Sequence, residues 1–405
     1  MPDEEVGWPR HHVPLKPERR PAAKGLKNRY AANASIHELA EEIGRSYGFV
    51  HRTLAVASGA FWSRGVRAKP LIACPVVPND VRRSTTGWSR RPDDPAKTPK
   101  DRELRVFIDI PSELEAALID LPLPPWRTDD SFLATSTMER YRTDLTAIPQ
   151  FEETTATLRH ALTREGGGYA VLRLGNLAKE LGTDNDRFLR IATSFAAEVA
   201  VPFSPFPRWP LWKDIGVKVE KDPGKSSGIG YNAFHMDLVN ATLPPDFTTL
   251  LCVRPDPLGG GPSILSDAHA AAARLSEDCQ ALLTESAYHY GTFFDLFGVG
   301  EEYKPFPILD GSNLGKGFVR FSAKMLERSK LCPEHAEAAR ELADELVRGQ
   351  VSFMLQPGDY LVVNQRRFLH GREALHSGQE TVPVADRRLL IQLFLRAKAD
   401  DGPAM

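Results

Sequence analysis

The sequence has little cysteine, and the four residues that it has lie far apart. Cys74, Cys252, Cys279 and Cys332 form no CxxC pair among 405 residues, which argues against a disulfide framework or a structural zinc site. Long apolar runs are absent too: no stretch approaches the roughly 18 residues that cross a bilayer, and the charged, Pro-rich N-terminus has no apolar signal-peptide core. These absences favour a cytoplasmic protein without a membrane segment.

The chain also lacks a strong net charge, because its formal charge is only -2. The charge is uneven, however: residues 1–105 carry 20 Lys and Arg against 12 Asp and Glu, and the remainder carries 31 against 41. Such asymmetry is typical of a basic nucleic-acid-binding arm on an acidic enzyme. A solvated basic tail has the same pattern, so charge alone leaves both interpretations open.

The first quarter of the chain divides into three segments by composition. Residues 1–30 are rich in Pro, Lys and Arg without periodicity, which predicts a disordered basic tail. Within residues 31–70, Ser35 and Glu38 form a capping box, and two short helices are expected over 35–58 with a break at Gly44. Residues 71–103 are polar and contain several prolines, which indicates a flexible linker to a main domain over 104–405.

The two expected helices over 35–58 resemble the short helix-turn-helix segments of actinobacterial regulators. The second helix would offer side chains such as Arg45, His51 and Arg52 to phosphates and bases, which makes DNA a candidate partner. A helical hairpin that packs on an enzyme without binding DNA would have the same spacing.

The main domain mixes strand-like and helical segments. TTLLCVRP, PSILSD, SFMLQPGDYLVVNQ and RLLIQLFLR are apolar runs separated by Gly and Pro turns, which is typical of strands. NDRFLRIATSFAAEVA and PEHAEAARELADELVRG have apolar residues at helical spacing. This mixture predicts a mainly β fold with flanking helices, of the α+β class, preceded by the small all-α helix-turn-helix segment.

The motif YNAFHMDLVN at residues 231–240 places His235 and Asp237 one residue apart. In an extended strand these two positions face the same side, so an imidazole and a carboxylate can converge on one metal ion. His370, in VVNQRRFLHGR, is the candidate third ligand of a 2-His-1-carboxylate set for Fe(II). Because a lone His-x-Asp pair is more often only hydrogen-bonded, the case for iron depends on the elements around it.

Those elements follow the motif in order: GGGPSILSD at 259–267, a PGD turn at 357–359, NQRRFLHGR at 364–372 and DRRLLIQLFLR at 386–396. Over residues 150–398 this order resembles the clavaminate-synthase/taurine-dioxygenase superfamily of Fe(II)/2-oxoglutarate oxygenases, most strongly its clavaminate-synthase-like amino-acid hydroxylases. The resemblance implies a double-stranded β-helix, the jelly-roll or cupin-like core. It also implies Fe(II), 2-oxoglutarate and O2, with His235, Asp237 and His370 as the iron ligands.

The same resemblance implies residues for the co-substrate. Ser263 occupies the Thr/Ser position that contacts 2-oxoglutarate in the family. A guanidinium on the last strand would match the distal carboxylate of 2-oxoglutarate in a bidentate manner. Arg388 is the expected residue, with Gln392 on the same strand face as a helper, whereas the family often has two arginines four residues apart there. Arg387 would face the opposite side, and Arg396 lies near the strand end.

The implied activity is hydroxylation of an unactivated C–H bond of a small amino-acid-like metabolite, free or carrier-bound, with decarboxylation of 2-oxoglutarate to succinate. The carboxylate of Asp237 favours hydroxylation or desaturation over halogenation. Residues 205–234 mix aromatics, charges and glycines and suggest a substrate lid, in which Arg208, Lys213 or Lys218 could hold an acidic or zwitterionic substrate or lie on a plain surface loop. The alternative function is a DNA-binding regulator whose oxygenase fold senses iron or a metabolite.

Overall fold

The computed structural model describes residues 107–121 and 142–397, apart from 164, 184, 207–208, 222–223, 292, 295–300, 303, 311–316 and 329–330. The tail, the helix-turn-helix segment and the linker expected over residues 1–103 lie outside the described residues. The domain boundaries therefore stay predictions.

The larger of two main sheets has seven strands in the order β1-β2-β13-β6-β15-β3, with β4 also paired to β15. All of its pairs are antiparallel except β1 with β2. The strands are β1 (Phe107–Asp109), β2 (Tyr169–Arg173), β3 (Val201–Phe203), β4 (Lys213–Gly216), β6 (Phe247–Arg254), β13 (Asp359–Asn364) and β15 (Leu389–Arg396). The central strands β6 and β13 are buried almost throughout, because both faces of this sheet are covered.

The smaller sheet has the order β12-β7-β14-β5. Its strands are β5 (Asn232–His235), β7 (Ser263–Asp267), β12 (Val351–Phe353) and β14 (Phe368–Arg372). Between the two sheets lies an apolar cluster with Leu250, Cys252, Leu265, Leu361 and Leu390 among its members. Two packed, mainly antiparallel sheets confirm the predicted double-stranded β-helix core. Short hairpins β8 (Phe293–Phe294) with β9 (Glu301–Glu302), and β10 (Leu309–Asp310) with β11 (Phe318–Val319), are added to it.

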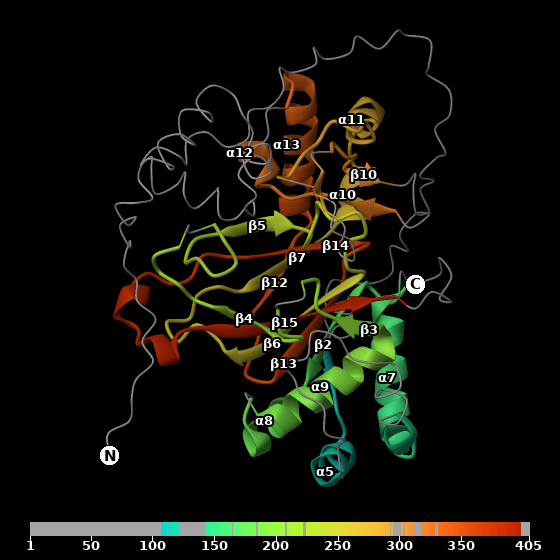
Figure 1. The fold of residues 1–405 in the computed structure, drawn as a ribbon, viewed down its shortest axis with the longest axis vertical. Helices are drawn as coiled ribbons and strands as arrows, with labels where there is room; N and C mark the ends of the chain where they lie inside the picture. Colours follow the sequence, from blue (N-terminus) through green and yellow to red (C-terminus); the bar gives the residue numbers. More distant parts are fainter. Residues whose placement is uncertain are drawn as a thin grey trace, which may run out of the picture. The chain divides into compact units, whose positions relative to one another are not determined.

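Helices cover the outer faces of both sheets (Figure 1). The outer face of the larger sheet packs against α5 (Ser112–Asp120), α7 (Pro149–Leu162), α8 (Gly175–Leu181) and α9 (Asp186–Val199). The smaller sheet packs against α10 (Ala268–Ala273), α11 (Glu277–Leu283), α12 (Met325–Arg328) and α13 (Pro333–Arg348). Two 3-10 turns, η3 (Gln379–Thr381) and η4 (Val384–Asp386), precede β15. Among the helices that the structure describes, none is long and apolar enough to span a bilayer.

Side chains alternate between the two faces of each strand, and this alternation selects which residues enter the space between the sheets. On β15, Ile391 and Leu393 belong to the outer cluster, whereas Leu390 belongs to the inner one. Gln392 therefore points inward with Leu390. The inner faces of β4, β6 and β15 thus supply polar side chains to one end of the inter-sheet space.

Candidate metal centre

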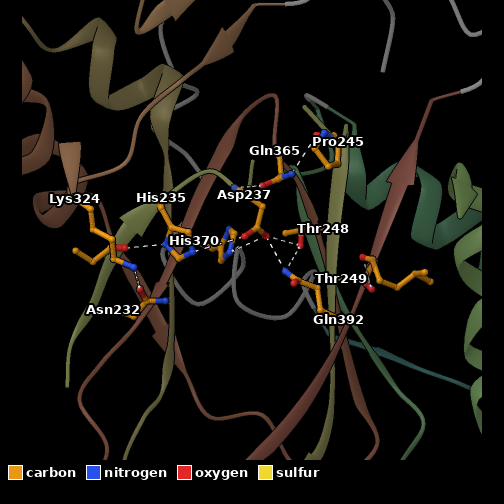
Figure 2. A network of polar contacts seen from close by, with 12 residues as sticks. Asn232, His235, Asp237, Pro245, Thr248, Thr249, Lys324, Gln365, His370 and Gln392 are labelled. Atoms are coloured by element: carbon orange, nitrogen blue, oxygen red, sulfur yellow. Dashed lines mark hydrogen bonds and ion pairs between the residues drawn. The ribbon is translucent and has the colours of Figure 1, made fainter. Parts of the chain in front are cut away.

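Three side chains converge where β5 lies beside β14. His235 ends β5 and is paired in register with His370 of β14, and Asp237 follows His235 by two residues. His370 Nε2 lies 3.3 Å from Asp237 Oδ2, and His235 Nε2 lies 3.9 Å from Asp237 Oδ1. One donor atom of each residue lies within 4.8 Å of the other two (Figure 2). In the part of the chain that the structure describes, no other group of His, Cys, Asp or Glu converges in this way.

Neighbouring groups orient the three candidate ligands. The carbonyl oxygen of Ala233 lies 2.9 Å from His235 Nδ1, so a proton on Nδ1 leaves Nε2 with a lone pair directed toward the other ligands. Thr248 Oγ1 and Gln392 Nε2 each donate a hydrogen bond of 2.9 Å to Asp237 Oδ2. Strands β6 and β15 of the larger sheet therefore hold the carboxylate that faces the two histidines of the smaller sheet.

The protonation states of this site favour a bound cation. Burial, reinforced by the neighbouring His370, lowers the pKa of His235 to about 3, so its ring is neutral at pH 7. Burial alone would raise the pKa of Asp237, but His370, His235 and the Thr248 hydroxyl together hold that pKa below its usual range. A neutral imidazole and an ionised carboxylate are the forms that bind a divalent metal ion.

The donor set fits Fe(II) better than a structural metal. Two imidazole nitrogens and one carboxylate oxygen form the facial set typical of non-haem Fe(II) oxygenases. A structural zinc ion would require four protein ligands, and no fourth His, Cys, Asp or Glu joins His235, Asp237 and His370 within the described residues. The chemistry of the donors thus fits a catalytic metal ion whose remaining coordination positions are open to exchangeable ligands.

Gln392 gives a first testable prediction about this centre. Replacing it by methionine keeps its length but removes the amide that bonds Asp237 and Thr248. Loss of such an outer partner weakens metal affinity by about 10- to 100-fold, which an anaerobic Fe(II) titration would measure. The exposed Gln356 supplies a matched control, Gln356→Met. Equal Fe(II) affinity of the two variants would show that Gln392 does not support the metal site.

Gly371 follows His370 on β14 and allows close approach of β5. A Cβ atom at this position would lie 2.6 Å from the carbonyl oxygen of Asn232, which is backbone and cannot rotate away. We expect Gly371→Ala to lower the free energy of unfolding by about 1–3 kcal/mol, as measured by urea denaturation. Gly175→Ala is the control, because its Cβ would meet Pro357 O at an ordinary 3.6 Å. Similar losses in both variants would contradict this explanation.

A second polar feature lies between the sheets. Arg388, just before β15, is only 6% exposed and lines a pocket together with Ser263, Cys252 and Asp256. Burial lowers the pKa of Arg388 to about 10, so the guanidinium still carries its charge at pH 7. No carboxylate forms an ion pair with it among the described residues, and both oxygens of Asp256 are occupied by the Gln379 side chain and three backbone N–H groups. A buried cation beside a hydroxyl group suits a carboxylate ligand.

The structure brings Ser263 and Arg388 into one pocket, but it places Gln392 elsewhere. The sequence suggested Gln392 as a helper of Arg388, whereas its amide contacts Asp237 and Thr248. The reason is the length of an extended strand: residues four apart share a face but lie about 13 Å from each other. Gln392 therefore reaches the candidate ligand instead of the pocket.

Other residues of the sequence motifs and of the expected lid lie away from the candidate ligands or outside the described residues. Arg372 of the HGR motif donates to the carbonyl oxygens of Gly228 and Gly230, each at 2.8 Å, and so fastens the segment that leads into β5. Asn364 donates to Leu162 O at 3.1 Å. Lys218 is exposed, and Arg208 lies outside the described residues. Arg387 and Arg396 donate to backbone carbonyls of Val382 and Leu243.

Sequence reasoning did not find Thr248 or Gln365. Thr248 is a fully buried polar residue inside an apolar strand, and that mismatch is the only signal it offers. Gln365 accepts a 2.7 Å hydrogen bond from the backbone N–H of Asp237 and donates to Pro245 O, across 128 and 120 residues of sequence. No local sequence pattern around Gln365 indicates such distant partners.

Comparison with known proteins agrees with this geometry. The model of the family described as "Taurine catabolism dioxygenase TauD, TfdA family" matches residues 135–390, more than half of the chain. A helix-turn-helix domain model matches residues 17–69. L-lysine 3-hydroxylase of Catenulispora acidiphila is 31% identical over 150 residues, a match that covers 34% of this chain and 39% of that enzyme. The match thus spans well under half of the relative's length.

Solved structures share the fold. Asparagine oxygenase in complex with Fe(II), 3-hydroxyasparagine and succinate has a TM-score of 0.53 at 21% identity, covering 74% of this chain and 92% of that one. Non-haem iron oxygenase OrfP in complex with Fe and α-ketoglutaric acid has a TM-score of 0.55 at 14% identity, covering 72% and 94%. The chain belongs to the TauD, TfdA family of dioxygenases, which use non-haem Fe(II), 2-oxoglutarate and O2.

Proposed function

We propose that this dioxygenase hydroxylates an unactivated C–H bond of a small amino-acid-like metabolite and converts 2-oxoglutarate to succinate. The proposal is carried by one observation, the convergence of His235, Asp237 and His370 into a set that suits Fe(II). An amino acid as substrate is supported by the relatives, which include a lysine hydroxylase and enzymes crystallised with hydroxylated asparagine and arginine.

In this proposal His235, Asp237 and His370 hold Fe(II). Bound iron would supply the activation of O2 for oxidation of the substrate, with 2-oxoglutarate as the source of the other two electrons and succinate and CO2 as its products. The chain's own part is to fix the ligands: Thr248 and Gln392 keep the Asp237 carboxylate in place. All three ligands are largely buried, which keeps bulk water away from the reacting atoms.

The pocket of Arg388 would take the distal carboxylate of 2-oxoglutarate. Its guanidinium can donate two parallel hydrogen bonds to a carboxylate, and the Ser263 hydroxyl can donate a third. The apolar walls that include Leu390 and Leu355 exclude water and strengthen this charge pairing. Asp256 also lines the pocket, but its oxygens are held by their own hydrogen bonds and form no ion pair with Arg388 among the described residues.

The test is 2-oxoglutarate turnover by the purified full-length protein with Fe(II). We expect succinate to form and an amino acid to stimulate its formation, with a product heavier by one oxygen atom in mass spectrometry. Succinate formation that needs no iron, or a total lack of turnover across amino acids and related metabolites, would contradict the proposal.

The proposal also assigns the segments of the chain. Residues 104–405 form the oxygenase domain, preceded by a basic tail at 1–30, a helix-turn-helix segment at 31–70 and a linker at 71–103. We place the enzyme in the cytoplasm, which accords with the free thiols of Cys252, Cys279 and Cys332.

A second function is favoured by the helix-turn-helix model that matches residues 17–69. In this alternative the protein is a DNA-binding regulator whose oxygenase domain senses iron or a metabolite. A mobility shift with genomic DNA fragments that weakens as salt rises, and that is lost in Arg52→Ala, would support it. Lack of binding at low salt, where phosphate contacts are strongest, would eliminate it.

A further inference from the structure

Lys213 lies in β4 directly opposite Gln392 of β15. Directly opposed residues of antiparallel strands project from the same face of the sheet. Gln392 projects into the inter-sheet space and donates to Asp237, and Ile215, two residues after Lys213, packs against the inner apolar cluster. The side chain of Lys213 therefore enters the same space, on the side of the candidate metal centre that the larger sheet provides.

The ammonium group of Lys213 has an aromatic partner but no paired anion. Its Nζ atom lies 3.7 Å from the centre of the Trp209 ring, which is a cation–π contact. In the described part of the chain no carboxylate forms an ion pair with Lys213. Burial lowers the pKa of Lys213, and the nearby charge that opposes this shift is Asp237. Burying a cation without a paired anion costs free energy. The position of such a cation beside an active site therefore indicates that it binds an anionic ligand.

Asp237 is unsuited to be that permanent partner. Its Oδ2 already accepts hydrogen bonds from Thr248 and Gln392, and in the proposed enzyme its carboxylate binds iron. Binding of the metal would thus neutralise the negative charge of Asp237, which otherwise balances the positive charge of Lys213. An anion delivered with the substrate would restore the balance.

A second lysine lies on the other side of the centre. Lys324 Nζ donates a 2.9 Å hydrogen bond to Asn232 Oδ1, and Asn232 begins the strand β5 that ends at His235 (Figure 2). A lysine therefore lies near the candidate ligands on the side of each of the two sheets. Such surroundings favour an anionic group of the substrate near the metal centre.

We propose that Lys213, held against Trp209, binds a carboxylate of the substrate, so that the enzyme accepts a free acid and not a carrier-bound thioester or an amide. This inference rests on the proposed function and narrows its substrate class. Conversion of a carboxylic acid to a thioester or an amide removes the negative charge, and with it the partner of Lys213.

The experiment compares wild type, Lys213→Met and Lys213→Arg, with the exposed Lys218→Met as the matched control. The probes are the twenty common L-amino acids and their carboxamides, assayed for stimulated succinate release and for oxygenated product. We expect acids to be preferred over their amides. Loss of a charge-assisted hydrogen bond predicts that Lys213→Met raises KM for the preferred acid by about 10- to 100-fold and abolishes the preference, while kcat changes little. Lys213→Arg should retain the preference, and Lys218→Met should match wild type.

Three results would overturn the inference: equal use of acid and amide by wild type, an unchanged KM in Lys213→Met, or an equal rise in Lys218→Met. If no probe is turned over, acetylation of Lys213 by acetic anhydride is measured anaerobically on the Fe(II)- and 2-oxoglutarate-bound protein. Protection by the pooled acids but not by the pooled amides supports the inference, and equal labelling overturns it. Slow succinate release in the absence of substrate distinguishes the proposed dioxygenase function from the role of Lys213. This release depends on the iron centre and not on Lys213.

Discussion

Replacing His235 by alanine, or Asp237 by asparagine, is expected to weaken iron binding by more than about 100-fold and to abolish 2-oxoglutarate turnover. Each change removes one of the three donor atoms that lie within 4.8 Å of one another. Because loss of an outer partner alone weakens metal affinity by about 10- to 100-fold, loss of a ligand should reduce it by more than about 100-fold. Iron content by elemental analysis and succinate release under excess Fe(II) measure the two effects.

The control for this prediction is His376→Ala. His376 is exposed, and its Nδ1 lies 2.9 Å from the neighbouring Ser377 carbonyl oxygen, away from the three candidate ligands, so iron content and turnover should stay at wild-type values. Far-UV circular dichroism of all variants would show that the fold is retained. Full iron content and turnover in the Asp237→Asn variant would refute the assignment of the metal centre.

Replacing Arg388 by methionine is the second change with a large expected effect. The substitution leaves a pocket of similar shape but removes the buried charge that would bind 2-oxoglutarate. Truncating one partner of a buried, hydrogen-bonded charge pair costs about 2–5 kcal/mol, so KM for 2-oxoglutarate should rise by about 30-fold or more. Arg388→Lys keeps the positive charge but loses the planar guanidinium with its two parallel N–H donors. We therefore expect its KM to lie between those of wild type and Arg388→Met.

Arg387→Met is the matched control for Arg388. The two arginines are adjacent, but Arg387 donates to Val382 O at 3.0 Å and does not line the pocket. Its replacement should therefore leave KM for 2-oxoglutarate within about twofold of wild type, because surface changes usually alter energies by less than about 0.5 kcal/mol. If Arg387→Met raised KM as much as Arg388→Met, the co-substrate site would lie elsewhere.

The sequence predicted best those features that depend on residues close together along the chain or on the order of motifs. His235 and Asp237 were paired on the assumption that both lie in an extended strand, whereas the structure ends β5 at His235 and places Asp237 in the turn that follows, still close to both histidines. His370 and Arg388 came from the order of motifs along the chain, which the family resemblance supplied. The β core with packed helices followed from alternating apolar runs and from the turns between them, and the two-sheet core confirms it.

The supporting residues could not be predicted, because their partners are distant. Gln392 meets Asp237 across 155 residues, and its assignment as a helper of Arg388 assumed that a shared strand face means a shared pocket. Lys213 was one of three basic candidates for holding the substrate, but a choice among them depends on the register of β4 against β15, which is set by tertiary pairing. Neither residue has a local pattern that distinguishes it from an ordinary surface or strand residue.

The pairing of β5 with β14 also links iron to the stability of the chain. His235 and His370 meet only when these strands pair, whereas an unfolded chain offers at most the short His-x-Asp fragment. Iron held by these proposed ligands would therefore bind the native state in strong preference to the unfolded state. By mass action, free Fe(II) at 100 times its dissociation constant would stabilise the fold by about 2.7 kcal/mol. A thermal melt followed as a function of added metal would thus report the assembly of the centre without any knowledge of the substrate.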